Sequence, residues 1–177
     1  VGCFSFYPTK NLGGITDGGA VLTDSDELAA TIRLLRAHGL TEDYVHTRIA
    51  TNSRLSEVPA AALRVGLPHL TADNERRRAI AARYREAAPQ MRWHAPHERH
   101  VYHLCVARVP DRAAFRAGAP FGTAVQYPRA LTQQPAYEQF AQWACPEAEA
   151  WAAECVSLPC FPEMTDDEIE AVCRSLP

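Results

Sequence analysis

The first 23 residues constrain the fold most strongly, because glycine and proline divide them into a strand, a tight turn and a second strand. Residues 2–6 are a short apolar run rich in aromatics, and residues 18–23 are a second strand-like run that opens on two glycines. Paired glycines at a strand start allow a close approach of the backbone to another group. The turn between the runs holds Lys10, the only lysine among 18 basic residues.

Lys10 differs in chemistry from the other basic side chains, which are all arginines. An amine can lose its proton when it is desolvated and can form a Schiff base with an aldehyde, which a guanidinium cannot do. The alternative is that Lys10 is a solvated loop residue. Its setting among glycines and aromatics favours the Schiff-base interpretation. Ser5, on the preceding strand, is placed to offer its hydroxyl to a phosphate at the same site.

Composition narrows the class of protein. The 177 residues carry a net charge of -3, with 47% hydrophobic and 22% charged residues, as in a soluble globular protein. No basic stripe predicts nucleic-acid binding, and no apolar run of about 18 residues predicts a membrane helix. Six cysteines without a CxxC pair or a secretion signal predict a reduced, cytoplasmic protein. The chain opens on a strand without an initial Met, which suggests a start inside a larger domain.

Helix and strand signals alternate along the rest of the chain, which predicts an α/β or α+β class. A capping box from Asp24 to Glu27 predicts a helix that stops at Gly39, and Ser56 predicts the cap of a second helix that Pro68 should bend. Further helices are expected over residues 74–87, 112–117, 146–155 and 166–176, and further strands over 101–109 and 123–127. A domain boundary is expected near residue 88.

Four histidines recur at three-residue intervals, a spacing that invites a metal-site interpretation. They are His94, His97, His100 and His103. Pro96 interrupts the run, and His103 falls in a strand-like segment, where a three-residue spacing does not place side chains on one face. We therefore expect no metal site.

Eight segments together resemble the DegT/DnrJ/EryC1/StrS family of aminotransferases, which depend on pyridoxal 5′-phosphate (PLP) and act on nucleotide-linked keto-sugars. The segments are SFYPTKNLG, DGGAVLT, LRAHG, TNSRLSEV, HVYHLCVARV, QYP, QQPAY and SLPCFPEMT. The resemblance implies an α/β fold of type I, like that of aspartate aminotransferase. Residues 1–88 would be the C-terminal part of the PLP-binding large domain, including the cofactor lysine and a long connecting helix. Residues 89–177 would be the small C-terminal α+β domain.

The resemblance also implies roles for individual residues. Lys10 matches the lysine that binds PLP covalently, and Ser5 matches the serine that binds the cofactor phosphate. Asn52 matches an asparagine that reaches the PLP phosphate of the partner subunit, which implies a homodimer with shared active sites. Arg54 is a weaker candidate for substrate contact in the same region, and Tyr127 matches a residue near the substrate entrance.

The implied reaction transfers an amino group from an amino acid, such as glutamate, to a keto-sugar in deoxyamino-sugar biosynthesis. A family subset with histidine at the lysine position performs dehydration, so Lys10 favours amino transfer. Gln126 and Thr132 stand where many members carry histidines that line the sugar site, which leaves the sugar open. The resemblance covers only the C-terminal half of a typical member. The alternative is therefore a truncated, catalytically incomplete member that folds or acts only with a partner chain.

Overall fold

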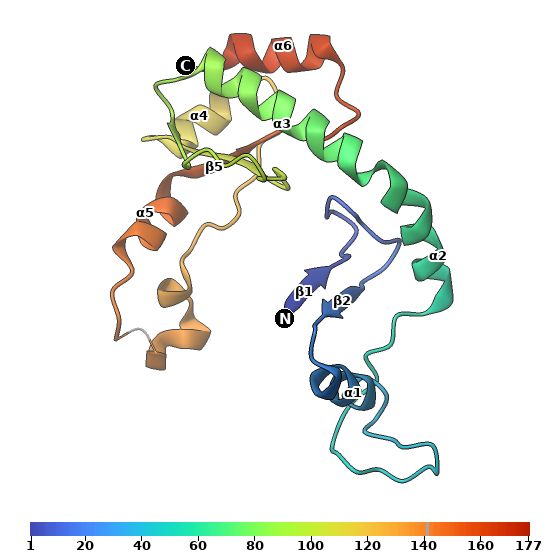
Figure 1. The fold of residues 1–177 in the computed structure, drawn as a ribbon. Coiled ribbons are helices and arrows are strands. Elements are labelled where there is room, and N and C mark those ends of the chain that lie inside the picture. The colour runs from blue at the N-terminus through green and yellow to red at the C-terminus, as the bar shows by residue number, and fades with distance from the viewer. Residues whose placement is uncertain (141) are drawn as a thin grey trace. The chain divides into compact units, whose positions relative to one another are not determined.

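The computed structural model describes residues 1–140 and 142–177, which form two compact units, Val1–Leu70 and Thr71–Pro177 (Figure 1). This border falls after the first residue of helix α3 (Leu70–Ala87), whereas the sequence predicted a boundary near residue 88. The difference arises because Ile80, Ala81 and Tyr84 of α3 belong to the buried core of the second unit. The division into large and small domains at residue 88 stays a prediction.

The first unit contains the predicted strand, turn and strand. β1 (Gly2–Ser5) pairs antiparallel with β2 (Gly19–Leu22), with Ser5 opposite Gly19. Beyond the ladder, Phe6 N donates to Gly18 O and Gly14 N donates to Phe6 O, both at 2.8 Å. A Cβ on Gly19 would lie 2.8 Å from the Phe4 carbonyl oxygen, so a side chain at this position would force the strands apart.

The helices of the first unit begin at hydroxyl residues. α1 (Asp26–Leu35) begins after Ser25, whose hydroxyl accepts the Leu28 N–H at 3.2 Å. The predicted cap at Asp24 is therefore wrong by one residue, because Ser25 takes the extended cap conformation. α2 (Glu57–Gly66) begins after Ser56, as predicted. The α-helix is interrupted at Pro68, as predicted, because proline lacks the N–H that an α-helix requires. Residues there form the 3-10 turn η1 (Leu67–His69).

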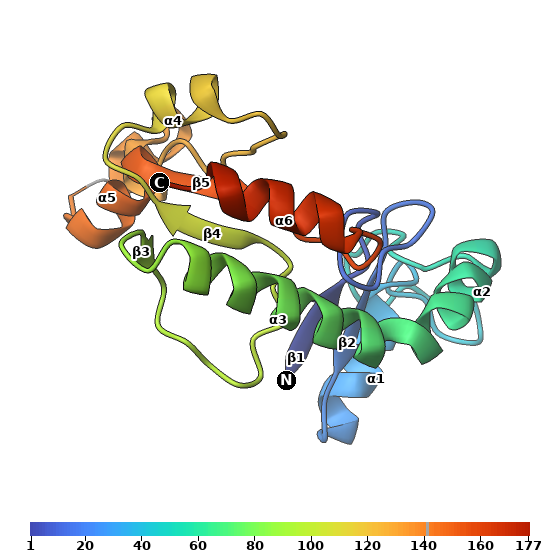
Figure 2. The same cartoon turned by 90° about the horizontal axis from the view of Figure 1, so that it is seen from above.

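The main core lies in the second unit. β3 (Arg92–Trp93), β4 (Cys105–Arg108) and β5 (Cys155–Leu158) form an antiparallel sheet in the order β3-β4-β5. α3 and α6 (Asp166–Ser175) run beside each other along this sheet (Figure 2). The largest fully buried side chains come from these two helices and from β4 and β5: Tyr84, Ile80, Ile169, Val156 and Cys105.

The remaining elements of the second unit are α4 (Arg112–Gly118), α5 (Pro146–Glu154) and the 3-10 turns η2 (Leu131–Gln133) and η3 (Pro135–Phe140). α4 and α5 were predicted. The predicted strand over 101–109 shortens to β4, because Tyr102 has a left-handed φ of 41°. No helix in the described residues is long and apolar enough to cross a bilayer.

The predicted strand over 123–127 is wrong. A single isolated β-bridge joins Ala124 to Ser157. The next contact between the two segments is between side chains: the Ser157 hydroxyl donates to Gln126 Oε1 at 2.7 Å. Pro128, which has no N–H to give to a ladder, follows directly. The segment therefore touches β5 without becoming a strand.

The predicted capping box is present at the start of α6, and it should make the stability of the folded chain depend on pH. Thr165 donates to the Glu168 carboxylate through its N–H at 2.8 Å and its hydroxyl at 2.9 Å. These bonds hold the pKa of Glu168 below its ordinary value. A carboxyl with a lowered folded-state pKa contributes stability above its unfolded pKa, and this contribution is lost as the pH falls through the folded pKa.

We expect Thr165→Ala to lower the urea midpoint at neutral pH and to reduce its fall in acid, because one of the two bonds that favour ionised Glu168 is gone. Urea unfolding at several acidic to neutral pH values measures both effects. Ser175→Ala is the control, since that hydroxyl bonds the Ala171 carbonyl at the other end of α6. An acid slope equal to that of the parent chain would contradict the prediction.

Candidate active site

Lys10 lies in the loop that joins β1 to β2. Its N–H donates to the Tyr7 carbonyl at 2.8 Å, which closes a turn, and its side chain is half-buried. A Cβ on Gly13 would collide with the Pro8 carbonyl, so the other arm of the loop packs directly on this turn. No carboxylate in the described part of the chain pairs with the Lys10 ammonium. The loop therefore presents one amine on a closely packed backbone.

Ser5 stands at the base of the same loop. It is the last residue of β1, its side chain is exposed, and its Oγ accepts the Tyr7 N–H at 3.3 Å. The hydroxyl hydrogen remains free to donate to an anion. Ser5 therefore lies on the strand that precedes the loop of Lys10, as the sequence predicted, and no hydrogen bond among the described residues joins the two side chains.

Asn52 and Arg54 form a second group in the first unit, on the segment between α1 and α2. Arg54 donates to Asn52 Oδ1 through its backbone N at 3.4 Å and its Nε at 3.0 Å. A bridge from Ala37 to Asn52 and a bond from Ser53 N to Arg36 O at 2.8 Å tie this segment to the end of α1. Because the amide oxygen is occupied, the Asn52 NH₂ and the outer guanidinium nitrogens are the groups left to bind an anion.

The predicted site residues do not all come together. The described residues show no hydrogen bond or ion pair between Lys10 or Ser5 and Asn52 or Arg54. Tyr127 belongs to the second unit, where the residue is 72% exposed. Its carbonyl accepts the Cys155 thiol at 3.7 Å, so β5 anchors the backbone while the ring faces solvent.

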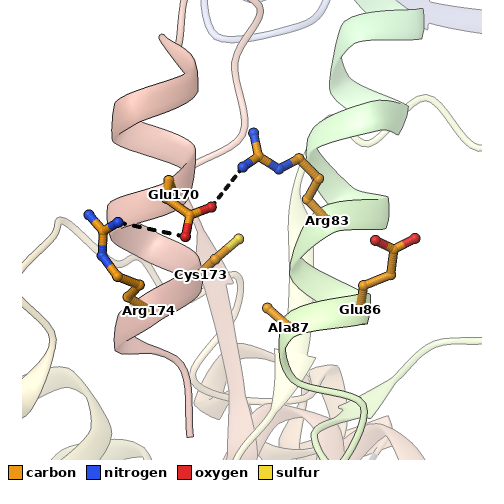
Figure 3. Close-up of a pocket in the computed structure, with 6 residues that line it drawn as sticks. All are labelled: Arg83, Glu86, Ala87, Glu170, Cys173 and Arg174. Carbon is orange, nitrogen blue, oxygen red and sulfur yellow. Dashed lines mark hydrogen bonds and ion pairs between the residues drawn. The ribbon is translucent and has the colours of Figure 1, made fainter.

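A surface pocket in the second unit holds none of the predicted residues. It is lined by Arg83, Glu86, Ala87, Glu170, Cys173 and Arg174, on α3 and α6 (Figure 3). Glu170 lies between two arginines, 2.8 Å from Arg83 and 3.6 Å from Arg174. Since one carboxylate pairs with both cations, the pocket is a poor match to a phosphate group.

The histidine run has a structural arrangement of its own. The rings of His94 and His100 stack with centroids 4.5 Å apart, and Tyr102 N donates to His100 Nδ1 at 2.9 Å. Burial, followed by the neighbouring His94, lowers the pKa of His100. Within residues 1–140 and 142–177, no three His, Cys, Asp or Glu side chains are grouped to hold a metal ion.

A profile of the DegT/DnrJ/EryC1/StrS aminotransferase family matches residues 1–177. The chain belongs to this family. The dTDP-3-amino-3,4,6-trideoxy-alpha-D-glucose transaminase of Streptomyces venezuelae is 39% identical over 174 residues, which cover 93% of this chain and 46% of that protein. The UDP-N-acetyl-3-dehydro-alpha-D-glucosamine 3-aminotransferase of Acidithiobacillus ferrooxidans is 37% identical over 179 residues, which cover 97% of this chain and 48% of that protein.

Solved structures confirm the predicted α/β fold of this aminotransferase family. DesV of S. venezuelae, in complex with a ketimine intermediate, superposes with a TM-score of 0.92 at 37% identity, over 98% of this chain and 49% of DesV. A DegT/DnrJ/EryC1/StrS aminotransferase of Brucella abortus also gives 0.92, at 31% identity, over the same shares. The chain spans about half the length of the relatives it matches.

PLP is the cofactor of this family, and the β1–β2 loop of the chain fits it chemically. NtdA of Bacillus subtilis, solved with bound pyridoxamine phosphate, superposes with a TM-score of 0.89 at 25% identity, over 98% of this chain and 44% of NtdA. Lys10 has an amine without a paired carboxylate in the described residues, which an aldehyde group could reach as a Schiff-base partner. Ser5 has an exposed hydroxyl that could donate to a phosphate. These two residues would hold the group.

Two features of the site were missed by sequence reasoning. The bond from Arg54 to the Asn52 amide could have been found, because residues two apart in a polar loop often bond locally. The bond from Ser157 to Gln126 joins residues 31 apart and carries no local signal.

Proposed function

We propose that this chain takes part in the PLP-dependent transfer of an amino group from an amino acid, such as glutamate, to a nucleotide-linked keto-sugar. The observation that carries the proposal is the single lysine of the chain, half-buried in a closely packed loop that begins at Ser5. The names of the dTDP-sugar and UDP-sugar aminotransferases among its relatives support the substrate class.

Lys10 and Ser5 would have separate roles in this reaction. Bound PLP supplies the electron sink for the reaction. When PLP is bound, Lys10 would hold it covalently, and the Lys10 amine would accept and return the proton of the donor's α-carbon. Ser5 would donate a hydrogen bond to the cofactor phosphate and so help to hold the group in place.

We also infer that Asn52 and Arg54 serve the site of a second subunit in a homodimer. Their outward N–H donors suit a phosphate, and neither residue is hydrogen-bonded to Lys10 or Ser5 among the described residues. Tyr127 would lie near the substrate entrance, with its exposed ring toward the sugar. Free thiols at all six cysteines support a reducing compartment, the cytoplasm.

We expect Arg54→Ala to weaken PLP binding by about 10- to 100-fold, because a hydrogen bond to a charged group contributes about 1.5–3 kcal/mol and 1.4 kcal/mol is a factor of ten. PLP titration followed by absorbance measures the effect. Arg48→Ala is the matched control, since Arg48 is an exposed arginine on the same segment. Equal weakening in both variants would indicate general electrostatics and would contradict a specific role for Arg54.

A second candidate function is that of an incomplete subunit that acts only with another chain. Large apolar side chains on both β1 and β2 are exposed, with Phe4 at 53% and Leu22 at 62%. Among the described residues of the first unit, Leu63 is the one large apolar side chain that is buried. A unit that buries so little apolar surface is weakly stabilised alone.

An amino-transfer assay distinguishes the two candidates. The chain is incubated with PLP, glutamate and a 3-keto nucleotide sugar, alone and with a chain that supplies the other half of a full-length relative. An aminated sugar from the chain alone supports the first candidate, and product only from the mixture supports the second. A dehydrated sugar in place of the aminated one would overturn the amino-transfer proposal.

A further inference from the structure

The β3–β4 loop (residues 94–104) is closed by aromatic side chains from its two ends (Figure 2). The rings of His94, at its start, and His100, near its end, stack with centroids 4.5 Å apart and planes 13° apart. The centroid of the Tyr102 ring lies 4.1 Å from that of His100. Arg85 of α3 donates to the His94 carbonyl at 2.9 Å. Two stacked imidazoles therefore hold the ends of the loop together, and α3 holds the loop.

The His100 ring must be neutral to make its hydrogen bond. Tyr102 N donates to His100 Nδ1 at 2.9 Å, so this nitrogen carries no proton in the closed loop. Tyr102 also has a left-handed φ of 41°, which is unfavourable for a bulky residue, and the bond to His100 helps to hold it there. A proton on Nδ1 would place one N–H against another and break the bond.

The His94 ring is also arranged as a neutral imidazole. Its Nδ1 lies 2.8 Å from the Ala95 carbonyl oxygen, which only accepts, so the ring proton is on Nδ1 and the bare nitrogen is Nε2. Nε2 is buried without a hydrogen-bond partner in the part of the chain that the structure describes. A proton on Nε2 would create a buried, charged N–H without an acceptor, which is costly.

The charged groups around the stack oppose protonation as well. The groups that face His100 are His94 and His97 from the same loop and Arg85 from α3. Arg85 is a permanent cation, and no carboxylate forms an ion pair with it among residues 1–140 and 142–177. His97 Nδ1 accepts the Arg99 N–H at 3.1 Å, a second bond that needs an unprotonated nitrogen. Burial, followed by these neighbours, holds the pKa of His100 below its ordinary value.

We propose that the β3–β4 loop is a pH-sensitive element, which is closed on α3 while His94 and His100 are neutral and is released when the stacked pair takes up a proton. Release breaks the bond from Tyr102 to His100 and separates the two rings. Tyr102 is 7% exposed and belongs to the same buried cluster as Tyr84, so release also uncovers one part of the core.

The direction of the pH dependence follows from the proton balance. In the released loop His100 titrates near the ordinary histidine pKa of about 6.5, whereas in the closed loop its pKa is lower. The released loop therefore binds more protons, so closure is strongest above about pH 6.5 and weakens as the pH falls below it. For one added proton, the population of released loop should rise about tenfold for each pH unit, until His100 of the closed loop titrates as well.

Amide hydrogen exchange of the 177-residue chain, followed by NMR between about pH 7.5 and about pH 5.5, tests the proposal after correction for the intrinsic pH dependence of exchange. Protection of the Tyr102 amide should fall about tenfold for each pH unit below about pH 6.5. Protection of the Val109 amide, which donates to the Glu154 carbonyl at 3.1 Å in the same unit, should stay constant. The imidazole signals should give His100 a pKa below about 6.5.

The substitution His100→Asn separates the hydrogen bond from the titration. Asparagine Oδ1 stands close to the position of histidine Nδ1 and can accept the Tyr102 N–H, but the amide does not titrate. The pH dependence of Tyr102 protection should therefore become much smaller in His100→Asn. It should be unchanged in His69→Asn, which removes an exposed histidine of the η1 turn.

Three results would overturn the proposal, and all three come from the parent chain, so they do not depend on the folding of a variant. Protection of Tyr102 could remain constant over the whole pH range. His100 could titrate at or above the ordinary histidine pKa. Tyr102 and Val109 could also lose protection together, which would indicate unfolding of the second unit and not release of one loop.

Discussion

Replacement of Lys10 by arginine will abolish covalent capture of PLP by the chain. Arginine keeps the positive charge and most of the side-chain length, but its guanidinium does not form a stable bond with an aldehyde carbon. Lys10 is the only lysine of the 177 residues, so in a sample of this chain the terminal amine is the one other aliphatic amine that PLP can label. Loss of the adduct on substitution therefore identifies the attachment site directly.

Borohydride reduction of the folded chain at micromolar PLP, followed by peptide mass mapping, measures this capture. The parent chain should carry a pyridoxyl group on Lys10, and Lys10→Arg should carry none at that position. Ser5→Ala should retain the adduct at a higher PLP concentration, since it removes a phosphate contact and leaves the amine in place. Equal labelling of folded and urea-unfolded parent chain would show that the loop confers no specific binding.

Replacement of Ile169 by alanine will destabilise the second unit by about 2–5 kcal/mol. Ile169 lies on α6 with 0% exposure, inside the cluster that also holds Ile80 and Tyr84. The substitution removes three buried carbon atoms and leaves a cavity beside α3. A loss of this size is a large share of the roughly 5–15 kcal/mol that stabilises a typical domain.

Urea unfolding followed by circular dichroism measures the loss. Ile49→Ala is the matched control, because Ile49 is fully exposed and the same atoms are removed. Its effect should stay within about 0.5 kcal/mol. Similar midpoints for the two variants would mean that α6 does not pack on α3 as described.

Sequence reasoning succeeded where a structure depends on neighbouring residues. The capping box at Thr165 and Glu168 needs only a hydroxyl and a carboxylate three residues apart, and it formed as predicted. The interruption at Pro68 follows from one missing N–H. The cap of α1 was wrong by one residue, because Asp24 and Ser25 are both good caps and Ser25 N bonds Thr23 Oγ1 at 3.1 Å, which favours Ser25.

Sequence reasoning failed where the outcome depends on distant partners. Residues 123–127 have strand-like composition, but strand formation needs a continuous ladder, and β5 offers only one bridge at Ala124. Helix α3 could not be assigned to a unit from its own residues, because the apolar surface that it buries lies on β4, β5 and α6.

The strand, turn and strand around Lys10, the family and the cofactor of that family could all be inferred from the amino-acid sequence, because these depend on local patterns and on motifs read in order. The tertiary structure alone decided that Arg108 is 4% exposed, with its Nε 2.9 Å from Glu154 and its guanidinium stacked over Trp151. A contact between residues far apart in sequence exists only after several elements have packed together. It therefore cannot be inferred from the sequence of any one segment.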